Sequence, residues 1–219
     1  MNILILNWRD IKHPNAGGAE HSTLKHAKAW IRAGHVVYWF ASHYKGAKIG
    51  ELYQGIGIIR SGRQYFDVQL RGFWWYMFEK HPNFDLVVDQ FHGIPFFTPL
   101  YVRTKKLAFI HEVAKEVWRL NPWPSPFNII AAAIGTFFEP WVYKIFYKRT
   151  PFITVSESTK KDLIEWEIPP ENINVIHNGV TVVKSKTNVK KENKKTAIYL
   201  GALAKDKGIE DAIAAFSLI

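Results

Sequence analysis

Residues 1–34, MNILILNWRDIKHPNAGGAEHSTLKHAKAWIRAG, contain the pattern that decides the fold. A continuous apolar run at residues 3–6 is followed by a polar loop, a glycine pair and a segment of helical periodicity. Apolar side chains recur on one stripe of that helix, which we place at residues 19–33, and Gly34 suits a left-handed C-terminal cap. A buried strand that leads into an amphipathic helix is the repeating unit of a parallel sheet.

Further apolar runs repeat this pattern along the chain. Their apolarity is continuous rather than alternating, which is typical of strands buried on both faces of a sheet. The sequence therefore predicts an α/β fold with a doubly wound parallel sheet. The runs are residues 36–40, 86–88, 107–110, 152–155 and 175–176, and residues 56–59 are a weaker candidate.

Two further helices are predicted between these strands. Residues 66–80 form one, which Pro82 ends, and another begins near residue 157 with Ser156 or Ser158 as its N-cap. Aromatic residues are abundant at 15% of the chain and often lie in clusters, most of which we expect in the core.

The longest apolar stretch covers residues 127–147 and is long enough to cross a bilayer. Glu139, Pro140 and Lys144 interrupt it, which argues against a membrane-spanning helix. We expect instead a helix that is buried in the domain or one that rests on a membrane surface.

The composition changes after Val183. Residues 1–183 read as one α/β domain, and residues 184–196 form a lysine-rich linker. Residues 197–219 then offer a strand at 197–200 and an apolar-periodic helix at 209–218, too little to bury a core. We expect them to be the first strand and helix of a truncated second domain.

The overall composition excludes several classes of protein. The chain has 219 residues, of which 47% are hydrophobic and 22% charged. This composition excludes an intrinsically disordered protein, a collagen and a coiled coil. Cysteine is absent, which excludes disulfides and thiolate metal sites, and no signal peptide is apparent, so we expect a cytoplasmic protein. A net charge of +10 would attract nucleic acid, anionic lipid or a phosphorylated substrate.

The glycine pair Gly17-Gly18, followed by Ala19-Glu20, lies between the first strand and the first helix. Backbone N–H groups and the helix dipole at this point favour an anion in the crevice at the sheet's carboxyl edge. The spacing is not that of a dinucleotide-binding turn, and no phosphate-binding NTPase loop is present. An equally simple explanation is that the glycines allow the loop to pack closely on the strand.

Polar side chains also follow other predicted strands. His111-Glu112 comes directly after one strand, where an imidazole can donate to a sugar hydroxyl or handle a proton. His92 has a similar place, although it could simply open the next loop. The histidines show no metal-ligand spacing, and we predict no metal.

A stretch of hydroxyl side chains precedes the helix near residue 157. Ser156, Ser158 and Thr159 lie between a strand end and this helix start, so they suit recognition of a polyol or a phosphate. Helix capping explains the serines equally well, and no nucleophile elbow surrounds them.

Taken in order, seven landmarks resemble the family 4 retaining glycosyltransferases, and they extend over essentially the whole chain. These landmarks are Gly17-Gly18-Ala19-Glu20, Gly34-His35-Val36-Val37, residues 93–100, His111-Glu112, residues 154–159, His177-Asn178-Gly179-Val180 and residues 201–208.

The resemblance implies the N-terminal half of a GT-B architecture, with a Rossmann-like domain that holds mainly the acceptor. The C-terminal domain would hold a nucleotide-sugar, and transfer would occur in the cleft between the domains without a metal or other cofactor. By position, His111 would be the catalytic residue beside the donor sugar. The cleft would be lined by Gly17, Gly18, Glu20, His92, Glu112, Ser156, Ser158, Thr159, Asn178, Gly179 and Lys207.

Two departures from the family pattern affect this implication. Gly201-Ala202 stands where the family has Gly-Arg, so one of two expected diphosphate cations is missing. The acidic E-x7-E element of the donor domain has no counterpart in these residues. The chain alone is therefore expected not to transfer sugar.

The leading interpretation is the acceptor-binding domain of a retaining, nucleotide-sugar-dependent glycosyltransferase of polysaccharide biosynthesis. Its acceptor would be a glycan or a lipid-linked molecule, and the basic charge suits an anionic membrane surface on the cytoplasmic side. The alternative is a non-catalytic module that binds a glycan or a phosphorylated ligand. Nucleic acid is disfavoured, because six of the cations fall in residues 184–195 and no nucleic-acid motif is present.

Overall fold

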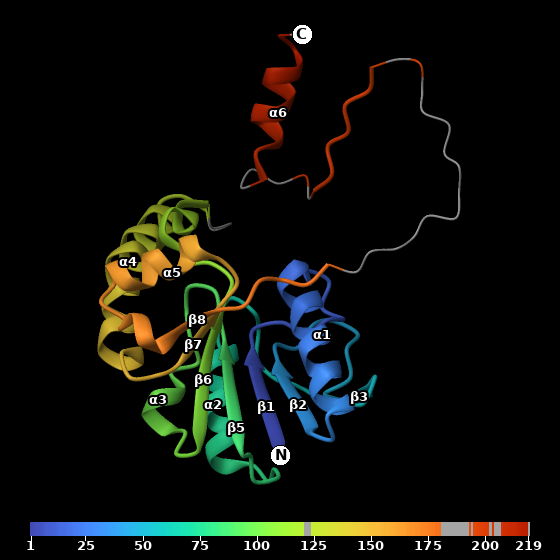
Figure 1. The fold of residues 1–219 in the computed structure, drawn as a ribbon, viewed down its shortest axis with the longest axis vertical. Coiled ribbons are helices and arrows are strands. Elements are labelled where there is room, and N and C mark those ends of the chain that lie inside the picture. Colours follow the sequence, from blue (N-terminus) through green and yellow to red (C-terminus); the bar gives the residue numbers. More distant parts are fainter. Residues whose placement is uncertain (121–123, 181–192, 194, 202, 204–206, 219) are drawn as a thin grey trace.

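A twisted sheet of eight strands forms the framework of the protein (Figure 1). This is a computed structural model that describes all residues except 121–123, 181–192, 194, 202, 204–206 and 219. The strands are β1 (Asn2–Asn7), β2 (Val36–Ala41), β3 (Gly50–Tyr53), β4 (Ile56–Arg60), β5 (Leu86–Gln90), β6 (Lys105–Ile110), β7 (Phe152–Thr154) and β8 (Ile173–Val175). Their order is β3-β4-β2-β1-β5-β6-β7-β8, and within the described residues only β3 runs antiparallel to its neighbour.

Helices cover both faces of this sheet. One face carries α1 (Gly18–Arg32), and the other carries α2 (Val68–Phe78), α3 (Thr98–Tyr101), α4 (Phe127–Val142) and α5 (Glu157–Glu165). Successive side chains of a strand point to opposite faces. Ile3 therefore packs in the cluster that holds Ala27 of α1, whereas Leu4 packs with Trp75 of α2. The predicted doubly wound α/β class is confirmed.

The edge strand β3 was not predicted. It pairs with β4 through a turn in which Gln54 and Gly55 both have positive φ, of 51° and 85°, as a tight two-residue hairpin requires. A strand of four residues, none of them buried, carries too little hydrophobic pattern to be recognised from sequence. The weaker candidate at 56–59 is confirmed as β4.

The C-terminal segment differs from the prediction in one respect. Residues 197–200 do not form a strand, because a strand needs a partner and none of the described residues pairs with them. The predicted helix is present as α6 (Ile209–Phe216), and it buries no residue. Most of the predicted linker at 184–196 lies outside the described residues, and the division into domains stays a prediction.

The long apolar stretch forms α4 followed by one π-helical segment, η2 (Tyr143–Tyr147). Together they make a helix of 21 residues with a mean hydropathy of 1.3, long and apolar enough to cross a membrane, yet only 22% of its most apolar window is buried. Of the two expected alternatives, a helix buried in the domain is therefore wrong for most of this stretch, and a helix that rests on a membrane surface stays a prediction. The expected burial of aromatic clusters is likewise wrong for Trp74, Phe137, Phe138 and Trp141, which are exposed.

A buried carboxylate in β5 organises the polypeptide that follows this strand. Asp89 has no exposed surface and accepts hydrogen bonds from the N–H groups of Phe96 and Thr98, at 3.1 and 3.2 Å. The hydroxyls of Thr98 and Tyr147 donate to it as well. Burial raises the pKa of Asp89, and the four donated bonds oppose that rise. One side chain thus joins β5, the loop before α3, and η2.

A second buried charge holds the loop after β1. Arg60, at the end of β4, is fully buried and binds Asp10 through two hydrogen bonds of 2.7 and 3.0 Å. It also donates to Glu51 of β3 at 2.9 Å. A paired guanidinium satisfies its charge in the interior, so the loop that precedes the glycine pair has a defined path.

We predict that Asp89→Asn lowers the free energy of unfolding by about 3 kcal/mol, because the amide NH₂ group confronts buried donors that then lack an acceptor. Urea denaturation followed by circular dichroism measures the loss. Asp85→Asn, the same change at the exposed residue before β5, should cost about 1 kcal/mol or less. Equal losses for the two variants would contradict an organising role for Asp89.

Candidate functional site

The carboxyl ends of the parallel strands lie in register at one edge of the sheet. Asn7 of β1 pairs with Gln90 of β5, and Ile110 of β6 pairs with Thr154 of β7. We call the loops that leave these ends the rim; they are residues 8–18, 91–97, 111–114, 155–159 and 176–180. All the predicted site residues except Glu20 and Lys207 belong to the rim. The chain turns from β1 to one side and from β5 to the other, which is where ligands bind in doubly wound sheets.

The glycine pair occupies the start of α1, as predicted. A Cβ atom built on Gly18 would meet nothing within 4 Å, so close packing does not explain this glycine. The N–H of Gly17, however, donates to the Glu20 carboxylate at 2.6 Å and is already used. Glu20 is 1% exposed and also accepts from Arg9 at 3.2 Å. Glu20 therefore holds the loop before α1 through hydrogen bonds from Arg9 and Gly17. It does not face the rim as a free carboxylate.

His111 is the predicted catalytic residue, and it lies at the centre of the rim. Its Nε2 is buried and has no hydrogen-bond partner among the described residues. Burial is the main cause that lowers the pKa of His111, and the charge of Glu20 partly opposes this effect. The imidazole is thus neutral at pH 7 and offers one donor and one acceptor.

His92 and Glu112 lie beside each other at the rim. His92 Nδ1 is 3.8 Å from a Glu112 carboxylate oxygen, and its ring is 6.2 Å from that of Trp8. Burial lowers the pKa of His92, the charge of Glu112 opposes this, and the charges of Arg9 and, to a smaller extent, Lys207 lower it further. Lys207, although it belongs to the C-terminal segment, is thus one of the charges that act on His92.

The hydroxyl side chains of Ser156, Ser158 and Thr159 have two roles. They cap helix α5, and they connect it to the loop that begins with His111. Ser156 is the N-cap of α5 and accepts from the N–H of Thr159 at 3.2 Å. Ser158 lies 3.0 Å from Ser156 between hydroxyl oxygens, and Thr159 donates to the backbone carbonyl of His111 at 3.1 Å. The capping explanation holds for Ser156, while the exposed Ser158 stands next to it at the same edge.

Asn178 and Gly179 meet α1 across the rim. The Ser22 hydroxyl donates to the Asn178 side-chain oxygen at 2.7 Å, and Lys25 Nζ donates to the Gly179 carbonyl at 3.3 Å. The segment after β8 is thereby brought back to the helix that follows β1. The structure places the predicted glycine, histidine, serine and asparagine residues along one edge.

Sequence reasoning missed the polar residues at the strand ends themselves. Asn7 Nδ2 and Thr154 Oγ1 are buried without a hydrogen-bond partner among the described residues, like His111 Nε2. Gln90 accepts from Thr23 of α1 at 2.7 Å. The sequence does show a polar residue at the end of each of these apolar runs, which could have marked them as candidates. Only the strand register shows that these residues lie at one edge of the sheet.

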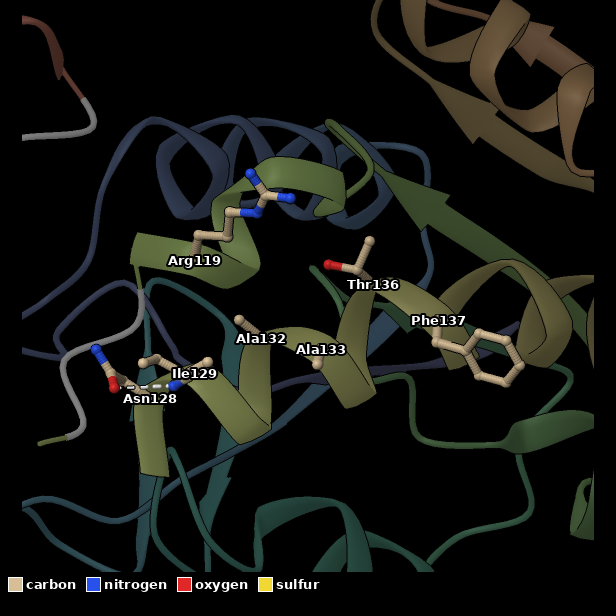
Figure 2. A pocket seen from close by; sticks show the side chains of 7 residues that line it. All are labelled: Arg119, Asn128, Ile129, Ala132, Ala133, Thr136 and Phe137. Carbon is tan, nitrogen blue, oxygen red and sulfur yellow. Dashed lines mark hydrogen bonds between the residues drawn. The ribbon is translucent and has the colours of Figure 1, made fainter. Parts of the chain in front are cut away.

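A pocket of about 700 Å³ is lined by α4 and the neighbouring 3-10 helix η1 (Lys115–Leu120), as Figure 2 shows, and it contains no predicted site residue. No group of three or more His, Asp or Glu side chains within the described part of the chain could hold a metal ion.

We predict that protonation of His111 destabilises the fold. Because the folded-state pKa lies below the ordinary value of 6.5, the unfolded chain binds the proton more tightly, and stability falls as the pH drops below that value. The free energy of unfolding in urea should therefore decrease from about pH 7.5 to about pH 5.5, and by less in His111→Gln. An identical decrease in both proteins would show that His111 is not the group responsible.

Comparison with known proteins gives distant structural likenesses, one of which is described here, and a family. No curated protein matches the chain. A solved structure, the UDP-forming alpha,alpha-trehalose-phosphate synthase from Burkholderia vietnamiensis, is 16% identical with a TM-score of 0.38. That match covers 76% of this chain and 43% of the synthase, so the chain spans less than half of the synthase's length.

The family model Glycosyltransferase Family 4 matches residues 16–184. This range contains every predicted site residue apart from Lys207 and includes the rim from the glycine pair to Gly179. Since the match extends over well more than half of the chain and agrees with the resemblance seen in the sequence landmarks, the chain belongs to glycosyltransferase family 4.

Proposed function

We propose that this chain is the acceptor-side domain of a retaining glycosyltransferase of GT-B architecture. It transfers a sugar from a nucleotide-sugar to a glycan or lipid-linked acceptor in polysaccharide biosynthesis. A donor domain, of which residues 197–219 are the beginning, supplies the opposite wall of the cleft. Residues 1–219 alone do not catalyse transfer in this proposal, because one wall cannot enclose both substrates.

The observation that carries the proposal is a set of unpartnered polar atoms at the carboxyl edge of the sheet, where the rim loops begin or lie. Asn7 Nδ2, His111 Nε2 and Thr154 Oγ1 are buried, and a buried polar atom without a partner is costly unless a ligand or water satisfies it. A sugar presents many hydroxyls that both donate and accept. The rim therefore has the chemistry that a polyol requires, within a chain of family 4.

The reaction explains why a neutral imidazole is useful here. Transfer with retention builds positive charge on the anomeric carbon and negative charge on the leaving diphosphate. A positively charged imidazolium beside the anomeric carbon would repel the positive charge that develops there. Neutral His111 can instead donate a hydrogen bond to a sugar hydroxyl or accept one. Lys207, one of the charges that act on His92, supplies a cation for the diphosphate.

No metal enters this proposal, since the cation and the backbone dipoles supply the stabilisation that transfer needs. We place the protein in the cytoplasm, at the inner face of the membrane, where a lipid-linked acceptor would be presented. The net charge of +10 and the exposed apolar helix α4 support that location.

We predict that the chain releases nucleoside diphosphate from a panel of nucleotide-sugars only after a separately produced donor domain and an acceptor are added. In that reconstituted enzyme, His111→Ala should reduce kcat about a hundredfold, with a smaller change in acceptor binding. His35→Ala is the matched control, since this histidine precedes β2 at the opposite, amino-terminal edge of the sheet, and it should leave turnover unchanged.

Two outcomes would contradict the proposal. Equal activity of the His111→Ala and His35→Ala enzymes would remove His111 from the reaction. Glycan binding without transfer after the donor domain is added would favour the non-catalytic binding module.

A further inference from the structure

The helix α4 exposes apolar side chains and buries its ionisable side chain, which is the opposite of an ordinary surface helix. Its one ionisable residue, Glu139, points inward and is only 4% exposed. Its large apolar residues face outward, and the members of this outward stripe are between 48% and 62% exposed. We call this stripe the α4 face; it consists of Phe127, Ile130, Ile134, Phe137, Phe138 and Trp141.

The inward side of α4 is held by polar bonds and close packing. The Glu139 carboxylate accepts from the N–H groups of Ala114 and Lys115, at 2.9 and 3.0 Å, and from Trp118 Nε1 at 2.8 Å. A Cβ atom on Gly135 would come within 2.2 Å of the Trp118 ring, so only glycine fits there. These contacts determine which side of the helix packs on the protein and which side is left exposed.

The α4 face is larger than a soluble surface ordinarily tolerates. From Phe127 to Trp141 it extends roughly 20 Å along the helix axis, and no member carries a charge. Contiguous exposed apolar patches of this kind mark sites of association with a protein or a membrane. The surrounding charges distinguish between these partners.

Cations border the α4 face. Lys144, which also pairs with Glu167, lies 5.2 Å from the centre of the Trp141 ring, and Lys148 and Arg149 are exposed just beyond it. On the other side, Arg119 lines the groove shown in Figure 2 together with Ile129 and Phe137. Aromatic and aliphatic side chains flanked by Lys and Arg match a bilayer interface that carries anionic headgroups.

We infer that the α4 face is a docking surface for an anionic lipid bilayer, on which α4 lies in the plane of the interface. The aromatic and isoleucine side chains enter the headgroup and acyl boundary, while the bordering cations meet lipid phosphates. This inference rests on the membrane association proposed above and names the surface responsible for it. It does not depend on sugar transfer, so vesicle binding and turnover can fail separately.

The test uses the whole chain and vesicles of phosphatidylcholine with about one third phosphatidylglycerol. We expect the protein to sediment with these vesicles, to detach as salt rises, and to bind vesicles of pure phosphatidylcholine much less. Ile134→Ser/Phe137→Ser should weaken binding about tenfold or more, because two exposed apolar anchors are lost. The matched control is Ile49→Ser/Leu52→Ser at the opposite end of the sheet, where both residues are exposed, and it should bind like the unaltered protein.

A second measurement reports which surface enters the bilayer. The chain has no cysteine, so Ile134→Cys and Leu52→Cys can each carry a single environment-sensitive dye. We expect a blue shift on vesicle addition for the dye at position 134 and none at position 52. A shift at both positions, equal vesicle binding by the two serine variants, or no binding by the unaltered protein would overturn the inference. A shift at position 134 that rises with protein concentration in the absence of lipid would assign the face to a second copy instead.

Discussion

The buried carboxylate of Asp89 is the interaction on which much of the architecture depends. It lies at the switch point of the sheet and collects four donors from the following loop and from η2. Desolvation of a carboxylate is costly, and it is sustained only when such donors are present. The loop at residues 91–97 can therefore hold one conformation at the rim, even though Phe97 has a positive φ of 55°.

Other buried charges perform the same task elsewhere in the chain. Arg60 and Asp10 hold the loop that precedes the glycine pair, Glu20 holds the pair itself, and Glu139 holds α4 against the loop after β6. Each of these side chains sits at a loop that would otherwise have no regular hydrogen bonds. Breaking such a pair leaves an uncompensated charge, so these residues impose geometry on the rim more than they add net stability.

Much of the fold follows from local sequence patterns. The apolar runs and the glycine pair at Gly17 predicted strands, helix starts and the strand ends that bear His111 and Ser156, because those signals lie within a few residues of each other. The roles of Asn7 and Thr154 could not be predicted, since they arise from strand register. The outward face of α4 could not be predicted either. The orientation of the helix depends on Glu139, whose hydrogen-bond partners lie 24 and 25 residues away in the sequence.

The attachment of α4 has a geometric consequence for the acceptor. Glu139 binds the backbone three and four residues after His111, so hydrogen bonds tie the helix to the part of the rim that holds His111. A protein seated on lipid through α4 carries His111 at a constant height above the phosphate plane. Acceptors would then be sorted by how far their reactive hydroxyl projects from the bilayer, a selection by reach that requires no contact with the rest of the molecule.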